Sequence, residues 1–205
     1  MIGFLGQAVK HYRTTGAIAP SSPALARVMT ESLRRHKGPK RVLEVGPGTG
    51  AFTKRIMHAL KPGDVFDIVE INPAFSRRLQ RELLDEFISA HPQISVHLHN
   101  HAIQTAPVDG EYDYIVCGLP FNNFPLSEVS RIFRRMMSLL REGGELMYFE
   151  YFGMKAVKMM WFRGRKRGRV RRRIALAKAM DRRYNGSRRV VLRNFPPASA
   201  FRLRA

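Results

Sequence analysis

Cysteine, acidic side chains and long apolar runs are all scarce in this sequence. The shortage of cysteine and of apolar runs argues against an internal disulfide and a membrane-spanning helix. Cys117 is the single cysteine, which rules out a disulfide within the chain and indicates a reducing compartment. It lies in the apolar stretch 114–118, where a small buried side chain is expected rather than a nucleophile. No apolar run approaches the roughly 18 residues of a spanning helix, so we expect the protein not to cross a membrane.

The first nine residues are apolar, but the sequence around them does not match a signal peptide, because no basic residue precedes them and no small-residue cleavage site follows. We therefore expect residues 1–9 to stay in the mature protein, in the cytoplasm. Lys10 and Arg13 follow these residues in the sequence. The pattern is typical of an amphipathic helix in a lipid headgroup layer, and equally of a helix packed on the protein's own core.

The shortage of acidic residues leaves a large positive charge. Lys and Arg number 36 against 16 Asp and Glu, a net charge of +20, which favours polyanions such as nucleic acid or anionic lipid headgroups as partners. The charge is densest within residues 155–173, directly after the apolar residues around Trp161. A lipid anchor, an RNA-binding arm and a solvated basic face all remain open for this segment taken alone.

A strand, a glycine turn and a helix are predicted from Arg41 onward. Residues 41–45 have the aliphatic content of a buried strand, and Gly46, Gly48 and Gly50 follow at alternate positions before a helical pattern begins at Phe52. Glycine lets a ligand approach the backbone, and the N–H groups of a helix start attract negative groups. The spacing differs from the dinucleotide fingerprint and favours a smaller nucleoside ligand.

A carboxylate supports this interpretation about 20 residues further on. The second predicted strand, residues 65–69, ends at Glu70, which can accept hydrogen bonds from both ribose hydroxyls. Together, the glycines and Glu70 resemble the S-adenosylmethionine-dependent methyltransferases, over Arg41 to about Tyr151. His101 occupies a position at which these enzymes often carry an acid. The resemblance implies cofactor contacts from Glu44, Gly46, Pro47, Gly48, Thr49, Gly50, Thr53, Glu70, Ile71, Asn72, His101, Ala102 and Gly118.

The remaining pattern alternates strands with amphipathic helices. Further strands are predicted near residues 94–98, 112–117, 145–152, 188–194 and 199–204, and the helix before the fifth strand is expected to close at residues 143–144. The alternation predicts one α/β domain over residues 1–205. The resemblance to the methyltransferases implies for it a Rossmann-like class I methyltransferase fold, with a mostly parallel seven-stranded sheet and helices on both faces. It would comprise an N-terminal helical cover (1–36), a cofactor-binding core (37–152), a basic apolar insertion facing lipid (153–187) and closing strands (188–205).

Three stretches resemble one family more closely, the bacterial phospholipid N-methyltransferases. They are Thr15–Ser22 with the following Leu-Ala-Arg, Gly118–Pro120 with the later Asn-Phe-Pro, and Val190–Ala198. In DNA and rRNA adenine methyltransferases, an Asn or Asp stands where this chain has Gly118 and accepts from the target amine. The resemblance implies methylation of the amine of phosphatidylethanolamine. Whether the mono- and dimethyl products are methylated onward to phosphatidylcholine stays open.

This resemblance also implies which residues meet the substrate. The expected contacts are Ser21, Ser22, Leu119, Pro120, Asn123 and Tyr151. Tyr151 is favoured because methylation produces a quaternary cation, and aromatic faces receive such a charge. Tyr12 and Tyr151 are the candidate catalytic residues, although the proton acceptor stays open between these two, solvent and the lipid phosphate.

No metal is expected. His97, His99 and His101 alternate along a predicted strand, but no carboxylate or thiol stands near them in the sequence. Imidazoles on a half-exposed strand are common without a metal.

Two rival functions remain. An rRNA adenine N6-dimethyltransferase fits the overall pattern and the charge, but Gly118 and the lack of a separate RNA-binding domain oppose it. A non-catalytic membrane-surface binding protein is opposed by the intact glycine turn and Glu70. Our expectation is a phospholipid substrate and an anionic membrane surface as partners, without a protein partner or nucleic acid, at the inner face of the cytoplasmic membrane.

Overall fold

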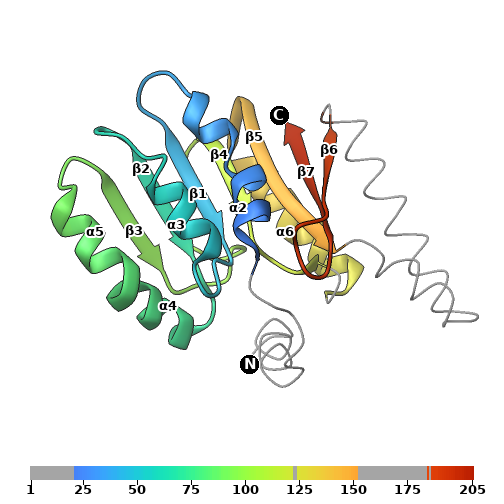
Figure 1. Ribbon diagram of the computed structural model, residues 1–205, viewed down its shortest axis with the longest axis horizontal. Coiled ribbons are helices and arrows are strands. Elements are labelled where there is room, and N and C mark those ends of the chain that lie inside the picture. Colours follow the sequence, from blue (N-terminus) through green and yellow to red (C-terminus); the bar gives the residue numbers. More distant parts are fainter. Residues whose placement is uncertain (1–20, 122–123, 152–183, 185) are drawn as a thin grey trace, which may run out of the picture.

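The computed structural model describes residues 21–121, 124–151, 184 and 186–205. Its sheet has seven strands in the order β3-β2-β1-β4-β5-β7-β6, and β7 runs antiparallel to both neighbours (Figure 1). The strands are β1 (Arg41–Val45), β2 (Val65–Val69), β3 (Ser95–His99), β4 (Tyr112–Cys117), β5 (Leu140–Tyr151), β6 (Ser187–Val191) and β7 (Ala198–Arg204). The predicted α/β fold with a mostly parallel seven-stranded sheet is confirmed.

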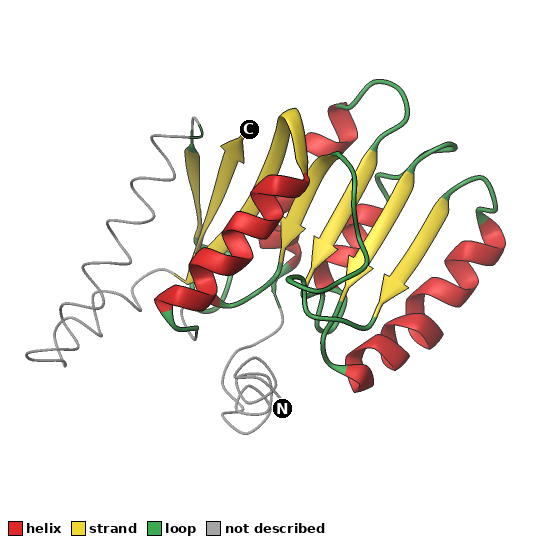
Figure 2. Cartoon of the chain, turned by 180° about the vertical axis from the view of Figure 1, so that it is seen from behind, coloured by secondary structure: helices red, strands yellow, loops and turns green. Residues whose placement is uncertain are grey.

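Helices cover both faces of this sheet (Figures 1 and 2). They are α2 (Pro23–Met29), the 3-10 helix η1 (Ser32–Arg35), α3 (Ala51–Met57), α4 (Pro73–Leu79), the π-helix η2 (Gln80–Leu84), α5 (Asp85–Ala90) and α6 (Leu126–Leu139). α6 packs Ile132 and Met136 against Tyr148 of β5 on one face. α2 and α3 pack against Met147 and Phe149 on the other, since successive strand residues point to opposite faces.

The central parallel strands end level with one another. Val45, the last residue of β1, pairs with Val69 of β2 and with Cys117 of β4. Residues that follow these three strands therefore emerge side by side at the carboxyl edge of the sheet, where open α/β sheets bind ligands. Cys117 itself is fully buried, and burial raises the pKa of its thiol to about 12, so it is the inert apolar residue that was expected.

The opposite edge of the sheet is fixed by a buried ion pair. Lys40, just before β1, and Asp64, just before β2, have fully buried side chains, and Lys40 Nζ lies 2.5 Å from Asp64 Oδ2. The backbone N–H groups of Lys40 and Lys61 donate to the same carboxylate at 2.9 and 2.7 Å. The pair therefore aligns the starts of two central strands.

The glycines at 143–144 do not close a helix, contrary to the prediction. α6 ends immediately before β5 begins, and Leu140 already pairs with Tyr112 of β4. Pairing resumes at Glu145 with Tyr114, so the residues between form a bulge in β5, where the first glycine has a φ of +74°. The last two strands are confirmed, although β6 ends at Val191 rather than at residue 194.

Two segments with predicted membrane contacts, residues 1–20 and most of the insertion 153–187, lie outside the described residues. Among the helices that are described, none has both the length and the apolar character needed to span a bilayer.

Candidate functional site

A cavity lies at the carboxyl edge, among the residues that follow β1, β2 and β4 and beside the end of β5. Glu70 is the acidic residue in its walls, which are otherwise mainly apolar side chains and glycine. The lining residues are Ser21, Val45, Gly46, Pro47, Gly48, Thr49, Ala51, Phe52, Val69, Glu70, Ile71, Phe75, His101, Ala102, Ile103, Gly118, Leu119, Pro120, Phe124, Phe149 and Tyr151.

Two loops approach each other closely beneath the cavity, and glycine is required at both. Gly46 has a φ of +71°, and a Cβ there would lie 2.3 Å from Cδ2 of Leu119. A Cβ on Gly118 would lie 2.5 Å from the carbonyl oxygen of Gly46. The strand ends fix this approach, because Gly118 donates to the carbonyl of Val45 at 2.8 Å and Gly46 to that of Val69 at 2.9 Å. The close approach of the two loops therefore explains why position 118 is glycine, which the sequence alone did not reveal.

Glu70 joins the second strand to the glycine turn. Its Oε2 accepts from the backbone N–H of Gly48 at 3.1 Å, and its Oε1 accepts from that of Asn72 at 2.8 Å. A carboxylate has about four acceptor sites, so each oxygen keeps acceptor capacity for a ligand. Burial raises the pKa of Glu70, and the N–H groups of Asn72, Gly48 and Ile71 oppose that rise.

Glu44 lies behind the glycine turn and is absent from the cavity lining. Its side chain is fully buried, and neither oxygen accepts a hydrogen bond of normal geometry from the residues that the structure describes. Burial raises its pKa to about 8; nearby Thr53 opposes the rise and the charge of Glu70 adds to it. At neutral pH, Glu44 is therefore mainly a neutral acid, and Glu70 is the one of the two that lines the cavity.

Aromatic rings form one wall of the cavity. The rings of Phe149 and Tyr151 meet edge to face with centroids 5.3 Å apart, and Phe52 of α3 meets Phe149 in the same way at 5.7 Å. Phe149 and Tyr151 are only 3% and 5% exposed, yet both line the cavity. Phe149 is therefore both a core residue and part of the cavity wall. Its alternation with Tyr151 along β5 is the signal that places both on one face.

Most residues predicted from the sequence surround this cavity. The structure brings together Ser21, Gly46, Pro47, Gly48, Thr49, Glu70, Ile71, His101, Ala102, Gly118, Leu119, Pro120 and Tyr151. Five others lie outside the lining: Glu44, Gly50, Thr53, Asn72 and Ser22. The lining residues that the sequence reasoning missed are Val45, Ala51, Phe52, Val69, Phe75, Ile103, Phe124 and Phe149. Tyr12 and Asn123 are outside the described residues.

Two of the residues outside the lining cap helices. Ser22 caps α2, with its Oγ accepting from the N–H of Leu25 at 3.2 Å, and Asn72 caps α4, with its Oδ1 accepting from that of Ala74 at 2.9 Å. Such side chains satisfy N–H groups that the first turn of a helix leaves unpaired. These two positions therefore have a structural role that the local sequence explains.

A carboxylate does lie beside the alternating histidines, although none stands near them in the sequence. Asp67 of β2 accepts from Tyr112 at 2.9 Å, and its Oδ1 lies 2.8 Å from His99 Nε2 and 3.5 Å from His97 Nδ1. Across the described part of the chain, no three His, Cys, Asp or Glu side chains are placed to hold a metal ion.

The chain matches a protein-family model. Residues 42–144, about half of the chain, match the family described as "Methyltransferase domain". The match spans the glycine turn, Glu70 and the loop that contains Gly118.

Individual proteins are also similar to this chain. "Ornithine lipid N-methyltransferase" of Singulisphaera acidiphila is 28% identical over 141 residues, which cover 69% of this chain and 72% of that protein. Among solved structures, an O-methyltransferase from Bacillus cereus in complex with SAH has 14% identity and a TM-score of 0.64, covering 98% of this chain and 90% of the other. The O-methyltransferase TomG from Streptomyces achromogenes, in complex with SAM, has 14% identity and a TM-score of 0.57, with 98% and 89% covered. At this identity, the two structures show a common fold.

Proposed function

This chain belongs to the family of methyltransferase domains, and we propose that it uses S-adenosylmethionine to methylate the amine of a membrane lipid, with phosphatidylethanolamine as the substrate. The observation that carries the assignment is one cavity in which a glycine turn and its carboxylate face an aromatic wall. The glycine turn and the carboxylate suit a nucleoside cofactor. The aromatic wall suits an amine that becomes cationic.

The residues present fit the cofactor. Glu70 keeps acceptor capacity for ribose hydroxyls, and a Cβ on Gly48 would meet nothing within 4 Å, so the space over the turn is open. Phe75, Ala102 and Ile103 supply apolar surface for adenine in the same walls. When bound, S-adenosylmethionine supplies a methyl group that its sulfonium activates for transfer.

The aromatic wall would hold the amine and exclude water from it. The edge-to-face contact fixes the rings of Phe149 and Tyr151 relative to each other, so little reorganisation is needed when an ammonium binds. The amine must be neutral to attack, although such amines are mostly protonated near neutral pH. The Tyr151 hydroxyl is one candidate acceptor for that proton, and solvent and the lipid phosphate are the others. Catalysis would therefore rest largely on positioning.

The lipid class is supported by the relative and by charge. The relative from Singulisphaera acidiphila is named for N-methylation of ornithine lipid, a lipid amine. A net charge of +20 suits an enzyme whose substrate lies in an anionic surface. Gly118 leaves no room for a side chain at the position where adenine methyltransferases place an acceptor, which disfavours an RNA substrate.

Labelled S-adenosylmethionine tests the proposal. The protein is supplied separately with vesicles that contain phosphatidylethanolamine, vesicles that contain ornithine lipid, and undermethylated rRNA. We expect label in phosphatidylethanolamine. Label in ornithine lipid alone would retain lipid N-methylation and change the substrate, whereas label in RNA alone would overturn the proposal. Vesicle binding without label in any acceptor would favour a non-catalytic lipid-binding protein.

A further inference from the structure

A short hairpin reaches past the aromatic wall of the cavity. Ala198, the first residue of β7, pairs with both Tyr151 of β5 and Val191 of β6. Residues 192–197, here called the hairpin tip, therefore lie just beyond Tyr151 at the carboxyl edge (Figure 1). Since Tyr151 lines the cavity, the hairpin tip stands beside it.

The hairpin tip exposes two large apolar side chains. Leu192 is 73% exposed and Phe195 is 84% exposed, whereas Ile88, an exposed apolar residue of α5, reaches only 36%. Exposing both a leucine and a phenylalanine to water at one turn forgoes the burial that normally stabilises such residues. This placement favours a partner that covers them.

A buried side chain between the two holds the hairpin tip in place. Asn194 is 3% exposed, and its Oδ1 accepts from the backbone N–H of Ser22 at 2.9 Å. Its Nδ2 donates to the carbonyl of Pro196 at 2.6 Å. Ser22 caps α2, and Ser21 before it lines the cavity. Leu192 and Phe195 are therefore presented at a fixed position relative to the site.

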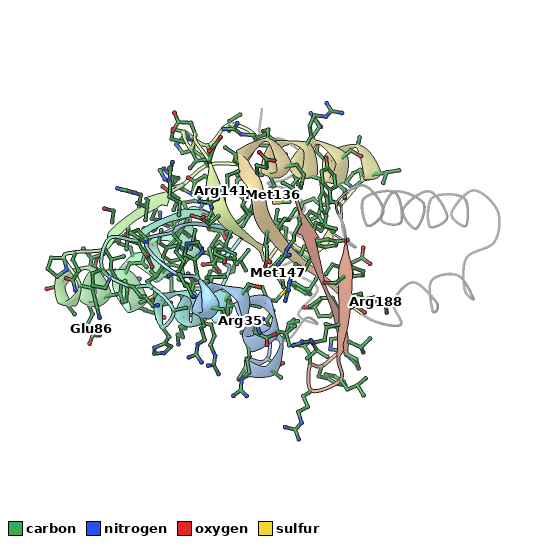
Figure 3. The ribbon with its side chains drawn as sticks, turned by 90° about the horizontal axis from the view of Figure 1, so that it is seen from above. Arg35, Glu86, Met136, Arg141, Met147 and Arg188 are labelled. Atoms are coloured by element: carbon green, nitrogen blue, oxygen red, sulfur yellow. The ribbon has the colours of Figure 1, made fainter. Side chains whose placement is uncertain are left out.

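The hairpin itself carries charge of one sign. From Gly186 to Ala205 the sequence has five arginines and no acidic residue. Some of these are paired within the molecule, as Arg189 is with Glu31 at 2.7 Å, but Arg193 is exposed in the hairpin tip itself, between the two apolar side chains. Figure 3 shows Arg188, on the edge strand β6, on the opposite side of the described residues from Glu86 of α5.

We propose that the hairpin tip docks on an anionic lipid bilayer, with Leu192 and Phe195 in the headgroup layer and Arg193 against the lipid phosphates. Apolar side chains flanked by basic residues are typical of interfacial anchors. A single-stranded RNA would use an aromatic ring for stacking but has no use for an aliphatic Leu192. A second copy of the chain would be repelled by the net charge of +20. The inference rests on the proposed function, since docking here brings the cavity to the lipid headgroups.

The test compares vesicle binding by the full chain and its variants. Leu192→Ser/Phe195→Ser should weaken sedimentation with vesicles of phosphatidylglycerol and phosphatidylcholine by about tenfold for each side chain removed. Ile88→Ser, at the far end of the sheet, is the matched control and should leave binding unchanged. Arg193→Gln should weaken it about fivefold, and only when phosphatidylglycerol is present, with Arg81→Gln on η2 as its control. Calorimetric titration with S-adenosylhomocysteine should give the same affinity in every variant, which confirms folding.

The outcomes separate this inference from the proposed function. If the wild type labels lipid but the double variant binds vesicles as the wild type does, docking by the hairpin tip is overturned and the function stands. If the wild type labels no lipid but the double variant loses vesicle binding, the function fails and the docking surface stands. A double variant that instead changes the oligomeric state, or loses affinity for single-stranded RNA alone, would overturn the bilayer as the partner.

Discussion

Replacing Glu44 by Gln should remove a pH dependence of stability that this buried carboxyl imposes. Burial raises its pKa to about 8 from an ordinary value of 4.5. Between these values, the unfolded chain has released its proton while the folded chain keeps it, so the free energy of unfolding falls as the pH rises. The expected slope is about 1.4 kcal/mol per pH unit, or about 4 kcal/mol between about pH 5 and about pH 8.

Urea unfolding across this pH range measures the effect. Glu44→Gln should match the wild type near the acid end and exceed its free energy of unfolding by several kcal/mol at the basic end, because a neutral amide has no proton to release. Glu145→Gln is the control of opposite sign. Burial acts to raise the pKa of Glu145, but hydrogen bonds from Ser32 and Arg204 outweigh burial and lower it. The stability that this carboxylate contributes is therefore lost as the pH falls. Parallel curves for wild type and Glu44→Gln would refute the reasoning.

Four further substitutions test the site and the fold. Glu70→Gln should weaken binding of S-adenosylhomocysteine about tenfold by calorimetry while leaving vesicle co-sedimentation unchanged, because a ligand acceptor is lost but the fold is kept. Gly118→Ala should weaken the same binding at least as much, since its Cβ would lie 2.5 Å from the Gly46 carbonyl oxygen and push the two loops apart. Phe149→Leu should raise KM for the lipid more than it lowers kcat, as measured by label incorporation. Asp64→Asn should lower the free energy of unfolding by about 3–5 kcal/mol, because Lys40 is left buried without its counter-charge, and it should not change KM.

The glycine turn and Glu70 could be predicted because their signal is local and ordered along the chain. Strand, turn and helix follow one another directly from Arg41, and Glu70 ends the next strand. Parallel strands whose last residues are in register must place these two features side by side, as the pairing of Val45 with Val69 does. The alternation of strands and helices predicted the α/β class, and the resemblance to methyltransferases implied the mostly parallel seven-stranded sheet.

Other features depend on partners that the local sequence does not reveal. Asp67 lies beside His99 only because β2 pairs with β3, and the bulge at residues 143–144 is set by how β5 pairs with β4. A pair of glycines after an amphipathic helix commonly marks the helix end, and the prediction used that rule. Here the chain already pairs with β4 before the glycines, so they lie within a strand instead. Phe149 shows a different limit, because a residue can be both buried and part of a cavity wall.

The contact between Asn194 and Ser22 joins residues that are 172 positions apart, and it ties the turn after β6 to the start of α2. Ser22 caps α2, which packs on the sheet face that bears Phe149 and Tyr151, while Asn194 fixes the turn that follows β6. If this bond were absent, the hairpin tip would be attached through its two strands alone, and its position beside the cavity would be less strictly defined. Each of the two end segments thus supplies half of one contact, made next to Ser21 in the cavity lining.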